Sequence, residues 1–391
     1  QKVWETYYNL ILGANAALDY IKEVSGTEED KAHVQAQALA LRAFYYLQLV
    51  NLFGEPYTYN KEALGVPLKL TSALSISYDK RKTVGEVYDQ IVRDLDEAEK
   101  YFLMLPKEKQ FLPNYRITLP AVQLLKARVN LYMNNLEEAA KYAKNVIEDW
   151  DFALYDLRSI SYDGVTFPNY VTYDNPETIW AFGKRNDLLK FTHDLMGDYG
   201  VKDHRVLINA SDELVDNYED EGDLRKQFYL VPEYGYTPVC YLAVSKCVFL
   251  GESIPSDDKF MLALRLSEAY LILAEATAKI DPTIALNAVN ELRKKRISEE
   301  KYKDKSGLSG DELLEFVRNE RRRELCFEGH RWFDLRRYGM PSFTRVWKEG
   351  GVAAKWFTME KEDAAYTLPI SKEVMDRNPG LVQNRLGNPK Y

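Results

Sequence analysis

Apolar residues recur at helical spacing through most of the chain. Residues 83–102 place an apolar stripe that includes Val87 and Ile91 on one face, and Thr83 with Glu86 has the pattern of a capping box at its start. The same spacing predicts further helices over residues 4–23, 29–53, 119–133, 136–147, 258–280, 283–293 and 311–327.

Two of these stretches repeat one plan. Residues 124–147 and 270–293 each read as a helix, a short polar break and an alanine-rich helix, with Ala139 of the first at the place of Ala285 in the second. Small residues at a crossing let paired helices approach closely, as in tetratricopeptide units. The pattern therefore predicts a scaffold of helical pairs.

Between residues 151 and 256 the pattern changes to short apolar runs separated by prolines and glycines. Residues 178–182 and 239–250 are predicted strands, and residues 211–218 a short capped helix. A smaller loop-rich stretch covers residues 57–78. Long loops on a rigid scaffold are where binding residues tend to lie.

The length of the chain bears on its domain organisation. At 391 residues it exceeds the size at which one compact core usually divides. We expect one large domain, mainly α in class, with a tetratricopeptide-like helical-pair scaffold and a loop-rich, short-strand ligand-binding lobe. The scaffold would comprise residues 1–150 and 257–340, and the lobe residues 151–256, to which the tail, residues 341–391, would return.

Residues 312–339 set acids and arginines where a buried helix normally carries leucine. Ser309 with Glu312 has the pattern of a capping box, and the apolar stripe that follows runs into Glu320 and Glu324. Buried carboxylates are costly unless they are paired. The candidate partners nearest in sequence are Arg318, Arg321, Arg322, Arg323 and Arg331. A structural ion network is the main interpretation, and a catalytic acid and base is the alternative.

Composition excludes several classes of partner. A net charge of −8 without a long basic stripe argues against a nucleic-acid or anionic-membrane surface. Cys240, Cys247 and Cys326 form no CxxC pair, which argues against a disulfide scaffold or a zinc site. No apolar run reaches the ~20 residues of a membrane span. The first residues carry no signal or lipobox, so we interpret the beginning as processed or trimmed.

Catalytic and metal motifs are not evident. The sequence contains no GxSxG, GxxxxGK[ST], GxGxxG or HExxH, and its four histidines offer no close ligand pair. The acidic run 216–223 is the best calcium candidate, but its spacing departs from an EF-hand loop and favours a solvated helix end. No cofactor is therefore expected.

Four motifs together resemble the SusD/RagB family of outer-membrane nutrient-binding lipoproteins. Three lie in residues 41–57, 265–276 and 368–384, in that family's order, and nearly the whole chain is covered. The fourth is carried by Glu320, Arg321, Glu324, Leu325, Glu328, Gly329, Arg331, Asp334, Leu335, Arg337, Tyr338 and Gly339.

The resemblance implies a binding protein rather than an enzyme. Members bind oligosaccharides, or in some cases peptides, unaltered and pass them to a SusC-like TonB-dependent transporter that they cover as a hinged lid. It also implies a location at the cell surface on the outer membrane, held by an N-terminal lipid anchor that this chain does not contain. Peptide cargo in the same architecture, or a helical-repeat adaptor for a protein partner, are the alternatives.

Sugar binding calls for flat apolar platforms and a few polar groups at their edges. The loops supply both in Tyr57, Tyr59 and Asn60, in Tyr162, Asp163, Phe167, Asn169 and Tyr170, and in Tyr234 and Tyr236. For each tyrosine, packing on the scaffold is the competing interpretation. Trp180 is expected inside a strand, Tyr45 and Tyr46 in the core, and Trp4, Trp332, Trp347 and Trp356 in structural roles.

Overall fold

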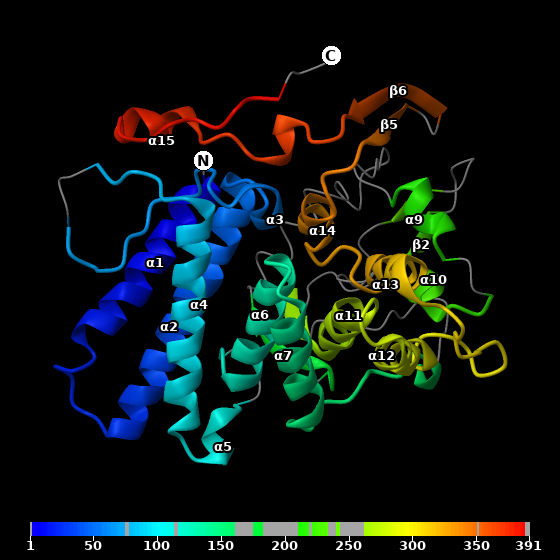
Figure 1. Ribbon diagram of the computed structural model, residues 1–391, viewed down its shortest axis with the longest axis horizontal. Coiled ribbons are helices and arrows are strands. Elements are labelled where there is room, and N and C mark those ends of the chain that lie inside the picture. The colour runs from blue at the N-terminus through cyan, green and yellow to red at the C-terminus, as the bar shows by residue number, and fades with distance from the viewer. Residues whose placement is uncertain are drawn as a thin grey trace.

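The structure is a computed structural model, and it describes residues 2–74, 78–112, 116–160, 175–182, 210–218, 221–233, 240–242, 262–349 and 352–387. Helices dominate it and stand side by side in a row, from the N-terminal pair at one end to α12 and α13 at the other (Figure 1). The mainly helical fold predicted from the sequence is confirmed.

The first half of the row is built from long helices. They are α1 (Lys2–Tyr20), α2 (Glu28–Phe53), α4 (Val84–Leu103), α6 (Leu119–Tyr132) and α7 (Leu136–Glu148), with the short α3 (Tyr57–Asn60) and α5 (Lys107–Gln110) between them. The capping box of α4 is present, because Thr83 Oγ1 accepts from the Glu86 amide at 3.1 Å and Glu86 accepts from the Thr83 amide at 2.8 Å.

The second half continues the row with α11 (Leu266–Thr277), α12 (Pro282–Lys294), α13 (Gly310–Glu324) and α14 (Arg331–Arg337). The predicted repeat is visible here, since α6 packs on α7 and α11 packs on α12. Ala139 and Ala285, the small residues that the repeat aligned, are both fully buried. Close helix crossings therefore account for that alignment.

Two helix starts differ from the prediction. Residues 262–265 form a strand instead of the helix predicted over 258–280, because they pair with β1, and α11 begins only at Leu266. Ser309 makes no side-chain capping bond to α13, and Gly310 has a left-handed φ of 56° at that point. The capping box predicted there is therefore wrong.

The remaining elements are short. Three antiparallel pairs join β1 (Thr178–Phe182) to β4 (Leu262–Arg265), β2 (Val231–Glu233) to β3 (Cys240–Leu242), and β5 (Phe343–Glu349) to β6 (Val352–Met359). The described helices α9 (Asp212–Asp216), α10 (Leu224–Tyr229) and α15 (Lys372–Arg377) complete the set. The predicted strand at 178–182 and the Ser211 cap of α9 are both present.

The tail lies along one end of the molecule (Figure 1). Its hairpin, β5 with β6, approaches α9, where Arg345 is 3.5 Å from Glu213. The later part instead packs on the scaffold, because the Leu368 amide and the Asn384 side chain donate to the carbonyls that end α2. Among the described residues, the hairpin thus lies near the irregular region to which the sequence assigned the tail, and the later part lies on the scaffold. The division into scaffold and lobe stays a prediction.

One large hydrophobic core runs through α1, α2, α4, α6, α7 and α11. Trp4, Tyr46 and Trp180 are buried in the fold, as expected. None of the helices in the described part of the chain has the length and apolarity that a membrane crossing needs.

Candidate functional site

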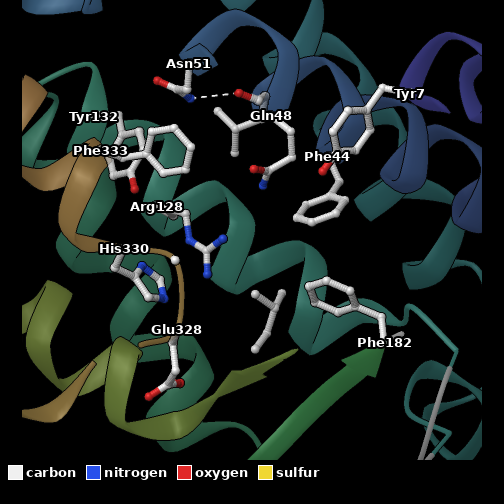
Figure 2. A pocket seen from close by; sticks show the side chains of 13 residues that line it. Tyr7, Phe44, Gln48, Asn51, Arg128, Tyr132, Phe182, Glu328, His330 and Phe333 are labelled. Carbon is white, nitrogen blue, oxygen red and sulfur yellow. Dashed lines mark hydrogen bonds between the residues drawn. The ribbon is translucent and has the colours of Figure 1, made fainter. Parts of the chain in front are cut away.

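A cavity of ≈ 140 Å³ opens where α1, α2 and α6 meet β1, β4 and the turn before α14 (Figure 2). Its wall combines aromatic rings with polar side chains from segments far apart in the sequence. The lining residues are Tyr7, Phe44, Leu47, Gln48, Asn51, Arg128, Tyr132, Phe182, Leu264, Glu328, Gly329, His330 and Phe333.

The apolar wall is held by the β1–α2 contact. Phe44 and Phe182 lie with ring centroids 5.4 Å apart, and Trp180 packs behind both at 5.3 Å and 4.6 Å. Trp180 is only 4% exposed, and its neighbours Ile179 and Ala181 are buried as well, so both faces of β1 are covered. The two phenylalanine rings are therefore fixed at the edge of the cavity by a buried tryptophan.

The polar wall centres on Arg128 of α6. Its Nε and Nη2 donate to the Glu268 carboxylate at 2.7 and 2.5 Å, which fixes the guanidinium plane. Burial acts to raise the pKa of Glu268, but Arg128 and Arg321 hold that pKa below its usual range. Figure 2 shows the Arg128 guanidinium directed into the cavity. The site therefore contains a guanidinium whose charge is already balanced.

His330 lies beside Arg128 on the turn before α14 (Figure 2). Burial lowers its pKa well below the usual range, and the charges of Arg128 and Arg321 add to that effect. The ring is therefore neutral at neutral pH. Its Nδ1 is 3.2 Å from Nη2 of Arg321, a nitrogen that can only donate, so the ring proton is on Nε2.

Three more polar side chains complete the wall. Asn51 is engaged by the scaffold, since it donates to the Leu47 carbonyl at 2.8 Å and accepts from Tyr88 at 3.0 Å. Burial raises the pKa of Tyr132 to about 12, so its phenol stays protonated. The side chain of Gln48 is half-buried and forms no hydrogen bond with another described residue. The cavity thus offers ring faces on one side and hydrogen-bonding groups on the other.

An ion network supports the floor of the cavity. Glu328, in the cavity wall, accepts from Nε and Nη2 of Arg265 at 2.7 and 2.8 Å. Nη1 of Arg265 donates to Glu324 at 2.8 Å, and Glu324 also accepts from Arg225 and Arg296 at 3.0 to 3.2 Å. The network thus joins α10, which carries Arg225, the end of β4, which carries Arg265, and the C-terminal ends of α12 and α13.

The interpretation of Glu320 and Glu324 as members of a structural ion network is confirmed. Both side chains are fully buried and bonded to arginines. Burial acts to raise the pKa of Glu320, but Arg225 and Arg323 lower it to about 2. Glu320 is thus held as an anion, and both carboxylates lie in the interior, away from any surface that a substrate could reach.

The expected partners of these acids were mostly wrong. Of the five arginines nearest in sequence, Arg323 alone bonds to Glu320 within the described chain, at 2.6 Å. Arg321 bonds to Asp334, Arg318 to Glu275 and Arg322 to Glu213, while Arg331 makes no ion pair with a described residue. Successive residues on a helix point in different directions, so partners of buried acids come from other elements.

Two family models match this chain. One, described as the SusD family, matches residues 251–391, and the other, described as starch-binding associating with outer membrane, matches residues 1–131. Two SusD-like proteins of Formosa agariphila are each 26% identical to it. The first, P38, aligns with 85% of this chain and 71% of its own length, and the second, P2, with 99% and 80%. The chain belongs to the SusD family.

Solved structures agree with membership of the SusD family. A SusD superfamily protein from Bacteroides thetaiotaomicron superposes with a TM-score of 0.78 at 23% identity, over 98% of this chain and 85% of that one, and shows the shared fold. A putative sugar binding protein from Bacteroides vulgatus superposes with a TM-score of 0.76 at 26% identity, over 100% of this chain and 85% of that one.

The structure separates the three described ligand-binding candidates of this SusD-family chain. Tyr57 is half-buried, and its ring lies 4.9 Å from that of Tyr88, so it packs on the scaffold. Tyr59 is 50% exposed, with its hydroxyl 3.4 Å from Glu362, and Asn60 is exposed beside it. The other candidates, Tyr162, Asp163, Phe167, Asn169, Tyr170, Tyr234 and Tyr236, lie outside the described residues.

The predicted structural role of two tryptophans is wrong. Trp347 and Trp356 are 52% and 62% exposed on the β5–β6 hairpin, and neither belongs to a hydrophobic core that the described residues form. The cavity was not predicted from the sequence. A usable signal was present in Arg128 and Glu268, each of which is a charged residue in a mainly apolar helix and so indicates a buried pair.

No group of three or more metal-ligating side chains occurs within the ranges that the structure describes. The acidic run 216–223 is only partly the solvated helix end that its sequence predicted. Asp223 is 7% exposed and binds Arg225 through both carboxylate oxygens, at 2.9 and 2.7 Å. That carboxylate therefore belongs to the ion network.

Proposed function

We propose that this SusD-family chain binds oligosaccharides or polysaccharide fragments at the cell surface and delivers them to a SusC-like TonB-dependent transporter, without catalysis. One observation carries the proposal: the chain is similar along its full length, at 26% identity, to a putative sugar binding protein. The description of the matching N-terminal family model, starch-binding associating with outer membrane, supports the location. A lipid anchor preceding residue 1 would tether the protein.

The cavity supplies the chemistry that one sugar unit needs. The rings of Phe44 and Phe182 suit the C–H faces of a pyranose, and Arg128 with the Nε2 proton of His330 suits its hydroxyls. An engineered cavity of about 150 Å³ holds one benzene ring. The ≈ 140 Å³ of this cavity therefore suits a single terminal ring and not a stretch of polysaccharide.

Further contacts would come from the loops. Tyr59 and Asn60 are the exposed members of the first loop. We include with them the sequence candidates outside the described residues, Tyr162, Asp163, Phe167, Asn169, Tyr170, Tyr234 and Tyr236. Several weak contacts of this kind give modest affinity, so specificity would depend on the arrangement of the subsites.

Affinity electrophoresis tests this function. The purified chain is run through gels that contain plant, host or microbial polysaccharides, and at least one is expected to retard it selectively without being degraded. Degradation of a retarding glycan would contradict the non-catalytic role. If the chain binds peptides and no glycan, the cargo is peptide. Co-purification with an outer-membrane transporter tests the delivery step.

A matched pair of variants tests the cavity. Gln48→Leu removes a hydrogen-bonding group from the wall, and we expect about 5- to 30-fold weaker glycan binding, the loss typical of one hydrogen bond left unmade. Gln35→Leu changes another half-buried glutamine of α2 away from the cavity and should leave binding unchanged. Equal affinities of both variants and the parent would exclude the cavity as a subsite.

A further inference from the structure

The β5–β6 hairpin is unusual because large apolar side chains are exposed on both of its faces. Val346, Trp347, Trp356 and Phe357 are 39%, 52%, 62% and 42% exposed, and the described residues add no third strand to the sheet. Isolated hairpins are marginally stable in water, and exposed clusters of large apolar residues mark interaction sites. In Figure 1 the hairpin lies at the outer corner of the molecule, beyond α14.

The strand register divides these side chains between two faces. Arg345 pairs with Phe357 and Trp347 pairs with Lys355, so these four residues share one face. Two ring contacts agree with that assignment, because Lys355 Nζ lies 4.9 Å from the centre of the Phe357 ring and Arg345 lies 4.6 Å from that of Phe343. Each cation of this face is therefore directly opposite a ring on the other strand, and each is followed along its own strand by a ring. Directly opposed residues lie about 5 Å apart at Cβ.

The opposite face has a different chemistry. It carries the pair of Val346 with Trp356 and the pair of Thr344 with Thr358, whose hydroxyls are 2.8 Å apart. This second face contains an exposed tryptophan but no cation among those pairs. The two tryptophans of one hairpin thus lie in two separate environments.

Charge indicates what the first face would bind. The chain has a net charge of −8, whereas residues 343–359 contain Arg345, Lys348 and Lys355 against Glu349 alone. Arg345 already lies 3.5 Å from the exposed carboxylate of Glu213, which shows that a carboxylate can approach it. Guanidinium and ammonium groups beside flat rings suit a ligand that combines apolar ring faces with carboxylates.

We propose that this face of the hairpin binds an acidic polysaccharide, in which uronic-acid carboxylates pair with Arg345 and Lys355 while sugar rings stack on Trp347 and Phe357. The inference rests on the proposed function and names a substrate class for it. A protein interface would instead be depleted of lysine, whereas Lys355 lies directly opposite Trp347 on this face. The alternation of rings and cations instead matches the repeating alternation of ring faces and charges along a polyuronate.

The test compares Trp347→Ala with Trp356→Ala in gels of polygalacturonate and of neutral dextran. We expect Trp347→Ala to weaken binding to polygalacturonate about tenfold or more, as for loss of an aromatic anchor, and Trp356→Ala to change it less than about twofold. Lys355→Gln should also weaken it and reduce its dependence on salt. Circular dichroism on each variant confirms that the scaffold is folded.

Other outcomes would overturn the inference and separate it from the function on which it rests. Equal losses in the two tryptophan variants, or no loss in either, would reject the proposed face. Retardation of the parent chain by neutral or sulfated glycans but not by polygalacturonate would reject the polyuronate while glycan capture stands. Absence of retardation in every gel would reject both proposals.

Discussion

Arginines are buried in two regions of this protein, and the two regions balance their charge differently. In the network at α13, Arg296 is fully buried and donates to the carboxylates of Glu177 and Glu324. At the junction of tail and scaffold, Arg336 is 2% exposed, and its side chain donates to the carbonyls of Gly54 and Tyr366 and to the hydroxyl of Thr367. The first region neutralises charge with charge, and the second uses backbone dipoles.

The pKa values of the buried arginines differ between the two regions. Burial acts to lower the pKa of Arg296, but Glu324 and Glu177 raise it well above its usual range. Burial without a bonded carboxylate lowers the pKa of Arg336, and likewise that of Arg81, to about 10. Arg81 donates to four carbonyls, including those of Phe53 and Val382.

The tail junction has its own source of compensation. Phe53 and Gly54 lie at the C-terminus of α2, where free carbonyls carry the negative end of the helix dipole. Arg81 and Arg336 thus cap one helix end and hold the tail to it. A buried guanidinium is tolerated where most of its donors are bonded, by carboxylates in one region and by carbonyls in the other, although Nε of Arg336 has no partner among the described residues.

Removing one anion from the network should have the largest effect. Glu324→Gln keeps the side-chain volume but leaves Arg225, Arg265 and Arg296 with one carboxylate fewer, so we expect the free energy of unfolding to fall by about 3–5 kcal/mol. Urea denaturation followed by circular dichroism measures it. Glu97→Gln on the surface of α4 is the control, with a change of about 0–1 kcal/mol. A similar small loss in both variants would refute the role of Glu324.

Removing Arg336, the cation bound by backbone carbonyls, should lower the free energy of unfolding by a smaller amount. Arg336→Met leaves the Gly54 and Tyr366 carbonyls without their donor, for an expected loss of about 1–3 kcal/mol, because water can replace part of the bonding. Hydrogen exchange should increase locally in residues 364–385. Arg377→Met, at an exposed ion pair with Glu373, is the matched control. Unchanged exchange in the tail would show that Arg336 does not hold it.

Acid should affect the network before it affects the junction. Burial acts to raise the pKa of Glu320, but Arg225 and Arg323 lower it to about 2, against an ordinary 4.5. Arg337 lowers the pKa of the buried Glu275 to about 2 in the same way. A depressed carboxyl pKa stabilises the fold above pH 4.5, and the stabilisation is lost as pH falls toward 2. Tm should therefore fall over that interval, with exchange rising in α13 before residues 364–385. Simultaneous exposure of both regions would contradict this order.

The helical scaffold was predictable because its signal is local. Apolar spacing and the Thr83 cap depend on residues a few positions apart, and both were confirmed. The ion network was predicted in kind, since a carboxylate on an apolar stripe has to be paired. Its partners were not, because Arg225 lies 99 positions before Glu324 and only the fold brings them together.

The candidate site was much less predictable. The cavity takes its lining from several segments, and no local pattern relates Phe44 to His330. Exposure was missed at Trp347 for a related reason. Tryptophans are buried where another layer covers the strand, as Trp180 is, and the sequence of a hairpin does not show whether such a layer exists.

The smallest expected effect concerns two helix starts that share one capping-box pattern in the sequence but differ in the structure. Thr83→Ala should lower the free energy of unfolding by about 1 kcal/mol, because Thr83 accepts from the Glu86 amide. Ser309→Ala, at the start of α13, should change it by only a few tenths of a kcal/mol, within the range of surface substitutions, since Ser309 makes no capping bond there. Both sites have the same sequence pattern, so equal losses by thermal denaturation would mean that the pattern, and not the backbone at Gly310, decides the cap.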